Sequence, residues 1–305
     1  MREIPFTLDD LPEFSFPKVG LAVLGHPIGH SISPILHNAA LTLLAERDPV
    51  FTNWSYVRLD VIPEDLPDAL NRLSAAGFLG VNLTIPHKVE VLELLEDLDS
   101  NAKIMGAVNT LILRGQKWYG YNTDGYGLEV ALESELGCRF ENSQVLILGA
   151  GGAARAAAVQ ALLSGASKVH VHNRSSRSLN QLLDILHREF STSRATGSTV
   201  DNLAEEEFLS NDWIVINATS LGLKKEDPTP LFFNPSRFGE NSVFYDMIYN
   251  PKQTLFLAEA QKSGFRNANG LSMLVHQAAK ALEIWTDKEI SSKAMLQAAQ
   301  KYLQD

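Results

Sequence analysis

Hydrophobic and polar residues alternate along the first part of the chain with the periods of strands and helices. Strands give short apolar or alternating runs, and helices give apolar residues three and four positions apart. On this basis the predicted strands are 19–24, 54–59 and 80–83, and the predicted helices are 34–47, a helix through Leu66, Leu70 and Leu73, and 86–98. Two short runs around Gly115 predict a β-hairpin.

The rest of the chain repeats this alternation. Strands are predicted at 145–149, 168–172, 213–217 and 243–246, with helices between them. The segment 221–235, with its Lys-Lys-Glu-Asp-Pro cluster, predicts a mobile surface loop.

Regular alternation of strand and helix predicts an α/β fold with mainly parallel sheets and helices on both faces. A chain of 305 residues exceeds what one hydrophobic core usually supports, so we expect two domains. The last two predicted helices, 271–285 and 290–303, have no strand after them, so we expect them to return to the first domain. The predicted division is 1–123 plus 271–305 for the first domain and 124–270 for the second.

Composition narrows the class of protein. A formal charge of −10 without a Lys/Arg cluster argues against a nucleic-acid surface. The single cysteine, Cys138, excludes an internal disulfide framework and fits a reducing compartment. There is no apolar run of transmembrane length, no signal-peptide pattern in Met1–Pro17 and no metal-ligand cluster. We therefore expect a cytoplasmic protein, a monomer or homodimer, with no metal, nucleic acid or membrane partner.

A glycine turn follows the predicted strand 145–149. Gly149-Ala150-Gly151-Gly152-Ala153 stands between this strand and an Ala-rich predicted helix, as dinucleotide-binding turns require. Glycine lets the backbone bend and leaves room for a pyrophosphate, and the helix start directs unpaired N–H groups at the phosphates. An ordinary tight turn between strand and helix is the alternative.

The turn after the next strand bears on the choice of cofactor. Enzymes that select NAD usually carry an acidic residue there, which accepts hydrogen bonds from the ribose 2′-OH. This chain has Asn173-Arg174-Ser175-Ser176-Arg177, with two guanidinium groups and no carboxylate. Arginine suits a 2′-phosphate, so the turn favours NADP, although solvated loop arginines would give the same pattern.

Polar side chains also follow the predicted strands of the first domain. Taken singly, each has a simple structural explanation: Ser33 before Pro34 predicts a helix N-cap, and Lys88 predicts a solvated side chain. Together, at the carboxyl ends of a parallel sheet, they indicate a ligand site. The candidates are Ser31, Ser33, Thr84, Lys88, Asn109 and the predicted turn Asn122-Thr123-Asp124-Gly125.

These residues belong to a set of motifs that together resemble the shikimate dehydrogenase family, over about Val19 to Gln277. Each motif is modest alone, but their joint occurrence in this order is specific. The motifs are Gly25-x-Pro27-x-x-His30-Ser31-x-Ser33-Pro34, Asn82-x-Thr84-x-Pro86-x-Lys88, Gly106-Ala-Val-Asn109-Thr, Asn122-Thr-Asp124-Gly, the glycine turn, Asn217-Ala-Thr219-Ser, Tyr245-Asp-Met247-x-Tyr249 and Gly270-x-x-Met273-Leu-Val-x-Gln277.

The resemblance implies NADP-dependent reduction of 3-dehydroshikimate to shikimate, a step in chorismate and aromatic amino-acid biosynthesis. The first domain would bind substrate and carry the catalytic chemistry, and the second would be a Rossmann-type NADP domain. The implied substrate-binding residues are Ser31, Ser33, Thr84, Lys88, Asn109, Asp124, Tyr249 and Gln277. The implied cofactor-binding residues are Gly149, Ala150, Gly151, Gly152, Ala153, Asn173, Arg174, Ser175, Arg177, Thr219, Met247 and Gly270.

Lys88 and Asp124 would form the catalytic dyad of such an enzyme. An alkoxide develops when hydride reaches a carbonyl carbon, and the Lys88 ammonium would both stabilise and protonate it. Asp124 would orient Lys88 and accept a hydrogen bond from a substrate hydroxyl. Two alternatives stay open: a quinate/shikimate dehydrogenase using NAD, and a nucleotide-binding regulatory module without catalysis.

The chain departs from the family pattern in two places. Arg177 lies three residues after Arg174, whereas many NADP-using members have four, which puts the role of Arg177 in doubt. The extension Met1–Lys18 is absent from the shortest members, and a flap or an interface is the only hypothesis for it.

Overall fold

The computed structural model describes residues 4–13, 19–199, 211–230 and 234–304, which fall into two compact units. The first unit is Met1–Thr123 with Gln277–Asp305, and the second is Asp124–His276. The boundary at which the chain returns to the first unit, between His276 and Gln277, lies inside helix α9 (Leu271–Thr286), whereas the sequence placed this boundary just before that helix.

The first unit is built on a six-stranded sheet in the order β2-β1-β3-β5-β6-β4. β1, β2 and β3 are mutually parallel, and β5 runs antiparallel to β3 and to β6, so the hairpin expected around Gly115 is confirmed. The strands are β1 Val19–Gly25, β2 Trp54–Asp60, β3 Phe78–Leu83, β4 Asp97–Leu98, β5 Thr110–Arg114 and β6 Lys117–Tyr121.

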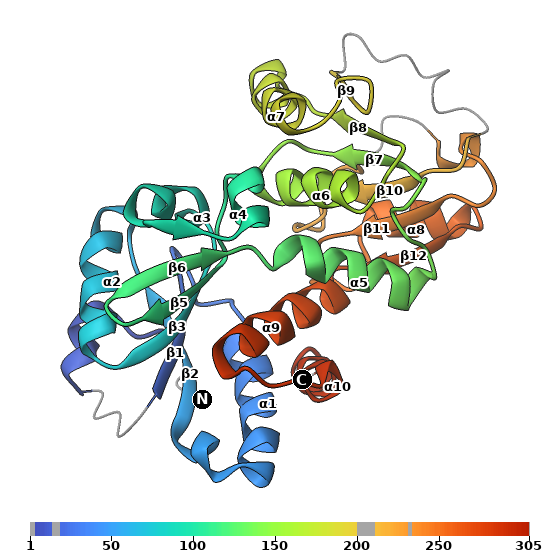
Figure 1. The fold of residues 1–305 in the computed structure, drawn as a ribbon. Helices are drawn as coiled ribbons and strands as arrows, with labels where there is room; N and C mark the ends of the chain where they lie inside the picture. The colour runs from blue at the N-terminus through green and yellow to red at the C-terminus, as the bar shows by residue number, and fades with distance from the viewer. Residues whose placement is uncertain (1–3, 14–18, 200–210, 231–233, 305) are drawn as a thin grey trace. The chain divides into compact units, whose positions relative to one another are not determined.

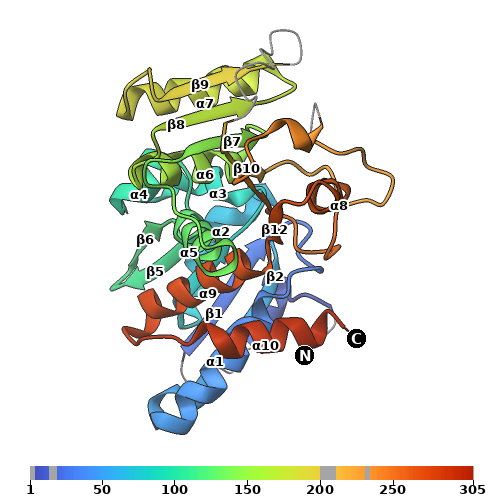
Figure 2. The same cartoon turned by 90° about the vertical axis from the view of Figure 1, so that its right-hand side faces the viewer.

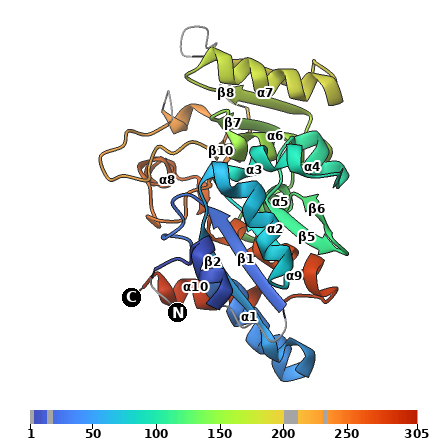
Figure 3. The ribbon, with the colours of Figure 1, turned by 90° about the vertical axis from the view of Figure 1, so that its left-hand side faces the viewer.

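Helices cover both faces of this sheet. The amphipathic helix α2 (Leu66–Ala75) lies on one side of the sheet (Figure 3) and buries its apolar face against a core that includes Phe78 and Val81. On the other side the Trp285 indole of α9 donates a hydrogen bond to the Leu111 carbonyl at 2.8 Å. Helix α1 (Ser33–Arg47) packs against α10 (Ser292–Tyr302), which confirms that the C-terminal helices return to the first unit.

The predicted helix 86–98 is wrong beyond its first turn. Helix α3 is only His87–Glu90, a 3₁₀ turn occupies Val91–Leu94, and β4 pairs with β6. A separate helix, α4 (Ser100–Met105), begins after Asp99, whose carboxylate accepts the Ala102 N–H at 2.7 Å. The apolar residues that pack into the core are Val91, Leu92, Leu95 and Leu98, and their spacing also fits one face of a helix, so periodicity could not distinguish the two conformations.

The described part of the N-terminal extension packs on the first unit. Phe6 forms an isolated parallel bridge with Leu59 on β2, and a 3₁₀ helix follows at Leu8–Glu13. Leu11 is buried in the core, and Arg72 donates a hydrogen bond to the Leu8 carbonyl at 2.7 Å. Residues 1–3 and 14–18 of the extension lie outside the described residues.

The second unit contains a parallel six-stranded sheet in the order β12-β11-β10-β7-β8-β9. Counted from β7, this is the 3-2-1-4-5-6 order of the Rossmann fold, which confirms the predicted fold class. The strands are β7 Gln144–Leu148, β8 Lys168–His172, β9 Ala195–Ser198, β10 Ile214–Asn217, β11 Val243–Asp246 and β12 Arg266–Asn269. β9 and β12 are short strands that the apolar pattern did not predict.

Helices flank this second sheet on both sides. α5 (Asp124–Leu136) and α6 (Gly152–Leu163) pack together on one side (Figure 1), and α7 (Ser176–Glu189) contacts α6. Helix α8 (Leu255–Lys262) lies on the other side (Figure 2), where Phe256 and Phe244 share a core. Of the predicted loop 221–235, residues 231–233 lie outside the described residues, and its mobility stays a prediction. None of the described helices has the length and apolar character that crossing a membrane requires.

Candidate active site

One edge of the first sheet gathers the predicted substrate residues of that unit. Ser31 and Ser33 follow β1, and Thr84 and Lys88 follow β3, which is parallel to β1. Asn109 precedes β5, but it reaches the same edge because β5 runs antiparallel to β3. Sheet pairing therefore brings these side chains to one edge, as expected from strand ends.

The predicted N-cap role of Ser33 is wrong. Ser33 is already the first residue of α1, and the N-cap position is occupied by Ile32, which makes no side-chain cap hydrogen bond. Instead the Ser31 Oγ accepts the Ser33 N–H at 3.3 Å and donates to the Ser33 Oγ at 3.2 Å. Both serines are partly exposed, so this edge presents two neighbouring hydroxyls at the start of a 15-residue helix.

Asn109 is the centre of a hydrogen-bonded cluster at this edge. Its amide nitrogen donates to the Thr123 Oγ1 at 2.9 Å and to the Gln277 Oε1 at 3.4 Å, and its Oδ1 accepts the Thr123 N–H at 2.8 Å. Asn109 is almost fully buried, whereas Gln277 is partly exposed. The structure thus joins two predicted substrate residues that are far apart in the sequence.

A second layer of buried polar side chains supports this cluster. Asn82 on β3 donates to the Asn109 carbonyl and to the Thr110 Oγ1, both at 3.0 Å. Tyr56 on β2 donates in turn to the Asn82 Oδ1 at 2.7 Å, and His37 stacks on the Tyr56 ring at 4.0 Å. Burial lowers the pKa of His37 to about 3, so this imidazole is neutral at physiological pH.

The two predicted catalytic residues lie in different units. Lys88 is partly exposed on the short helix α3, where its backbone carbonyl accepts the Val108 N–H at 2.8 Å. Asp124 is 8% exposed and is the first residue of α5. The turn predicted at Asn122–Gly125 is wrong for Asp124 and Gly125, which are the first two residues of α5. The Lys88–Asp124 dyad remains a prediction.

The glycine turn has the shape that a pyrophosphate needs. Gly149 has φ = 109°, and a Cβ there would lie 3.0 Å from the Ala218 carbonyl oxygen, so glycine is required. Gly151 and Gly152 are exposed, and a Cβ on either would meet no atom within 4 Å. The turn is therefore open in front of the first N–H groups of α6, and the residues present fit a dinucleotide phosphate.

The predicted ribose-phosphate turn follows β8. Ser175 caps α7 by accepting the Ser178 N–H at 3.5 Å, and Asn173 donates to the Ser175 carbonyl at 2.9 Å. Arg174 and Arg177 are both exposed. The two arginines are the charged groups of this turn, and both are open to a ligand phosphate.

The remaining predicted cofactor residues lie at the carboxyl ends of β10, β11 and β12. Thr219 follows β10, Met247 follows β11, and Gly270 follows β12. A Cβ at Gly270 would lie 2.1 Å from the Met247 carbonyl oxygen, so only glycine allows these two segments to approach so closely. Tyr249, a predicted substrate residue, is partly exposed on the segment that follows β11.

Comparison with known proteins identifies the family of this chain. The family model of the shikimate dehydrogenase substrate-binding domain matches residues 23–111, and that of the shikimate 5′-dehydrogenase C-terminal domain matches 270–300. The NADP(+) shikimate dehydrogenase of Methanocaldococcus jannaschii is 37% identical over 91% of this chain and 95% of its own length. The chain belongs to the shikimate dehydrogenase family.

Two further members of the shikimate dehydrogenase family are similar over most of their length. The NADP(+) shikimate dehydrogenase of Geobacter metallireducens is 38% identical over 88% of this chain and 91% of its own. The Thermus thermophilus shikimate 5-dehydrogenase, solved with NADP(H) and shikimate, has a TM-score of 0.77 and 33% identity. That alignment covers 93% of this chain and 99% of the Thermus chain.

One buried group of this shikimate dehydrogenase family member had no predicted role. Asp246, the last residue of β11, is 0% exposed and accepts hydrogen bonds from Asn217 and Thr254. Burial raises the pKa of Asp246 to about 6, against the lowering effect of these bonds. A carboxylate directly after the apolar run Val243-Phe-Tyr was the signal that could have identified it.

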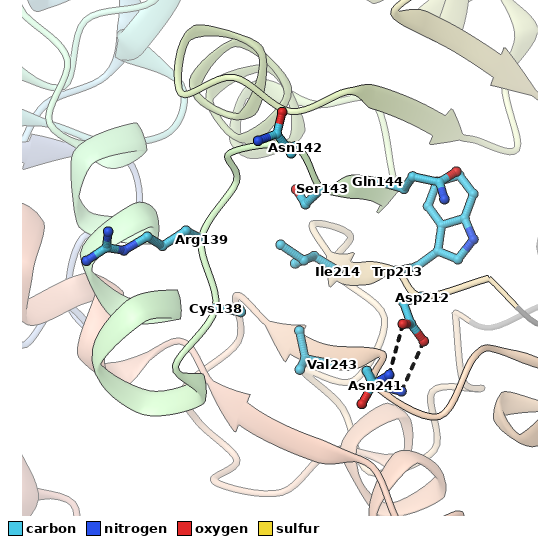
Figure 4. A pocket seen from close by; sticks show the side chains of 10 residues that line it. All are labelled: Cys138, Arg139, Asn142, Ser143, Gln144, Asp212, Trp213, Ile214, Asn241 and Val243. Atoms are coloured by element: carbon cyan, nitrogen blue, oxygen red, sulfur yellow. Dashed lines mark hydrogen bonds between the residues drawn. The ribbon is translucent and has the colours of Figure 1, made fainter.

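A cavity of about 390 Å³ lies at the amino-terminal ends of the strands of the second sheet, opposite the carboxyl ends that carry the predicted cofactor residues (Figure 4). Gln144, Ile214 and Val243, the first residues of three parallel strands, are among the residues that line it. Ligands of open α/β sheets bind at the carboxyl ends of the strands, so this cavity is not part of the dinucleotide site.

Proposed function

We propose that this protein catalyses the reversible reduction of 3-dehydroshikimate to shikimate with NADPH. The observation that carries the proposal is the polar edge of the first sheet, where Ser31, Ser33, Asn109 and Gln277 are held by hydrogen bonds. Such a set of neutral donors and acceptors suits a polyhydroxylated acid better than an apolar ligand. The similar proteins described above carry the name of this activity.

The two serine hydroxyls would bind the substrate carboxylate. They are neighbours at the start of α1, where the helix dipole adds a favourable positive potential. Tyr249 would lie near the same group. Thr84, Asn109 and Gln277 would contact the ring hydroxyls, which both donate and accept hydrogen bonds, as the amides of Asn109 and Gln277 do.

Lys88 and Asp124 would carry out the proton transfer to the substrate. When bound, NADPH supplies the hydride. The Lys88 ammonium would stabilise the oxygen that gains negative charge at the substrate carbonyl and then protonate it. The Asp124 carboxylate, 8% exposed, would orient Lys88.

The open glycine turn and the exposed arginines would bind NADP. Gly149 to Ala153 would surround the pyrophosphate, Asn173 to Arg177 would bind the adenosine 2′-phosphate, and Thr219, Met247 and Gly270 would line the nicotinamide end. The lack of a carboxylate at 173–177 supports NADP rather than NAD.

NADPH formation from shikimate, followed by absorbance, tests the proposal. We expect turnover with shikimate and NADP⁺ to exceed turnover with quinate, or with NAD⁺, by at least tenfold in kcat/KM. Equal use of quinate and NAD⁺ would favour the quinate/shikimate dehydrogenase alternative. Tight NADPH binding without turnover of either acid would favour the regulatory module.

A further inference from the structure

Asp246 connects three segments of the second unit through its side chain alone. Its Oδ1 accepts the Asn217 amide and the Ile248 N–H, both at 3.0 Å, and its Oδ2 accepts the Thr254 hydroxyl at 2.6 Å. These donors come from the end of β10, the turn after β11 and the residue that precedes α8. A single buried carboxylate therefore fixes three chain segments relative to one another.

The first of these connections continues to Thr219. The Asn217 Oδ1 accepts both the N–H of Thr219, at 3.0 Å, and its hydroxyl, at 2.7 Å. The Thr219 Oγ1 also accepts the Leu221 N–H at 3.1 Å. Asn217 is 0% exposed, and its amide nitrogen, which donates to Asp246 at 3.0 Å and to the Leu221 carbonyl at 3.2 Å, orients the Oδ1 that holds Thr219.

The second connection sets the backbone of Met247 and its neighbours. The Met247 N–H donates to the Asn217 carbonyl at 3.0 Å, and the Gly270 N–H donates to the Ile248 carbonyl at 3.1 Å. The Ile248 N–H donates to Asp246. Residues 246 and 247 are therefore hydrogen-bonded to the end of β10, and residue 248 to the end of β12. Tyr249 follows directly on this tied segment.

We propose that Asp246 is a positioning residue that fixes the nicotinamide end of the site, by setting Thr219 and Met247 at once. The inference rests on the proposed NADP-dependent function. Because Asp246 is 0% exposed, it acts through these residues and does not touch the cofactor or the substrate. The adenosine end, on β8 and α7, shares none of these hydrogen bonds.

The three donors determine which variants can keep the hydrogen bonds of residue 246. In Asp246→Asn the Oδ1 bonds to Asn217 and Ile248 can remain, and the new amide can donate to the Thr254 hydroxyl, which also accepts. Asp246→Ala removes all three bonds. Thr254→Val removes the Oδ2 bond together with the N-cap that the Thr254 hydroxyl gives α8, and Thr254→Ser, which keeps the hydroxyl for both, is its matched control.

The test compares two nucleotides on the full chain: NADP⁺ and 2′,5′-ADP, which carries the 2′-phosphate but no nicotinamide. For Asp246→Ala we expect the Kd for NADP⁺ to rise about tenfold and kcat with shikimate to fall about 10- to 100-fold. The Kd for 2′,5′-ADP should stay within about twofold of the wild-type value, because the adenosine end is not tied to Asp246. Asp246→Asn should restore all three values to within about threefold.

Two outcomes would overturn the positioning role. One is an Asp246→Ala protein with unchanged NADP⁺ affinity and kcat, and the other is equal loss of NADP⁺ and 2′,5′-ADP affinity. If Asp246→Ala does not fold, the affinities of Thr254→Val and Thr254→Ser for NADP⁺ and 2′,5′-ADP are compared in its place. If the wild-type protein does not oxidise shikimate, the proposed function fails, but the two nucleotide affinities still test Asp246.

Discussion

The hydroxyl of Tyr56 donates a hydrogen bond of 2.7 Å to the Oδ1 of Asn82, across the strand that separates them. Tyr56 belongs to β2 and Asn82 to β3, and β1 lies between them in the sheet. Asn82 then holds the Asn109 carbonyl at 3.0 Å. Asn109, a proposed substrate-binding residue, is thus supported by a buried chain of hydrogen bonds that begins at β2 and crosses β1 and β3.

Removing the Tyr56 hydroxyl should destabilise the protein. Tyr56→Phe leaves the Oδ1 of Asn82 buried without this donor, which costs about 1–3 kcal/mol of unfolding free energy. The urea-denaturation midpoint and the KM for shikimate are the measurements, and both should change, because Asn82 also fixes Asn109. Tyr302→Phe is the control: Tyr302 is 52% exposed, so its variant should stay within about 0.5 kcal/mol. Identical midpoints for the two variants would show that the bond contributes nothing.

Lys88 and Asp124 should behave as one catalytic group. Lys88→Ala should lower kcat about 10²- to 10⁴-fold, the usual contribution of general acid–base catalysis, with a much smaller change in KM. Asp124→Ala should cost a similar factor, and the double variant little more than either single one. Steady-state kinetics of the three variants with shikimate and NADP⁺ provide the measurement. Strictly additive losses would contradict the dyad.

Arg174 should discriminate between the two nucleotides. A charge-assisted contact with the 2′-phosphate contributes about 1.5–3 kcal/mol, or roughly 10- to 150-fold in KM. Arg174→Ala should raise the KM for NADP⁺ by about this factor and leave NAD⁺ kinetics nearly unchanged, an effect that salt should reduce because the group is exposed. Arg177→Ala, with its shifted spacing, should do less. A wild-type enzyme that uses NAD⁺ as well as NADP⁺ would refute this interpretation of the turn.

Asp246 should make stability fall with rising pH. Its pKa is raised from 3.8 to about 6, so the folded state binds the proton more tightly than the unfolded state does. The contribution is therefore fully present below pH 3.8 and is lost as pH rises through about 6, a change on the order of 3 kcal/mol. Denaturation midpoints of wild type and Asp246→Asn between pH 4 and 7 measure it, and the variant should lack this part of the slope. Parallel curves would mean that Asp246 does not titrate in this range.

Much of the fold follows from local sequence pattern. Strand β8 and strand β11 have the predicted bounds: β11 is an apolar run that ends at a polar turn, and β8 carries β-branched valines at alternate positions between polar residues. The open glycine turn was also recognisable, since its geometry depends on consecutive residues. Segment 86–98 was not, because its apolar residues fit a helix and an irregular path equally well.

The sequence by itself determined most of the strands that make up the two sheets, and it predicted candidate site residues at their ends. Only the tertiary structure decided which polar side chains meet: Asn109 with Gln277, Tyr56 with Asn82, and Asp246 with Thr254. The pair Tyr56–Asn82 depends on the order of strands in the sheet, and the pair Asn109–Gln277 depends on the packing of the Gln277 end of α9 on that sheet; no local period encodes either. The pairing of Asp246 with Thr254 depends on the path of the turn between β11 and α8, which side-chain hydrogen bonds fix once the core has formed.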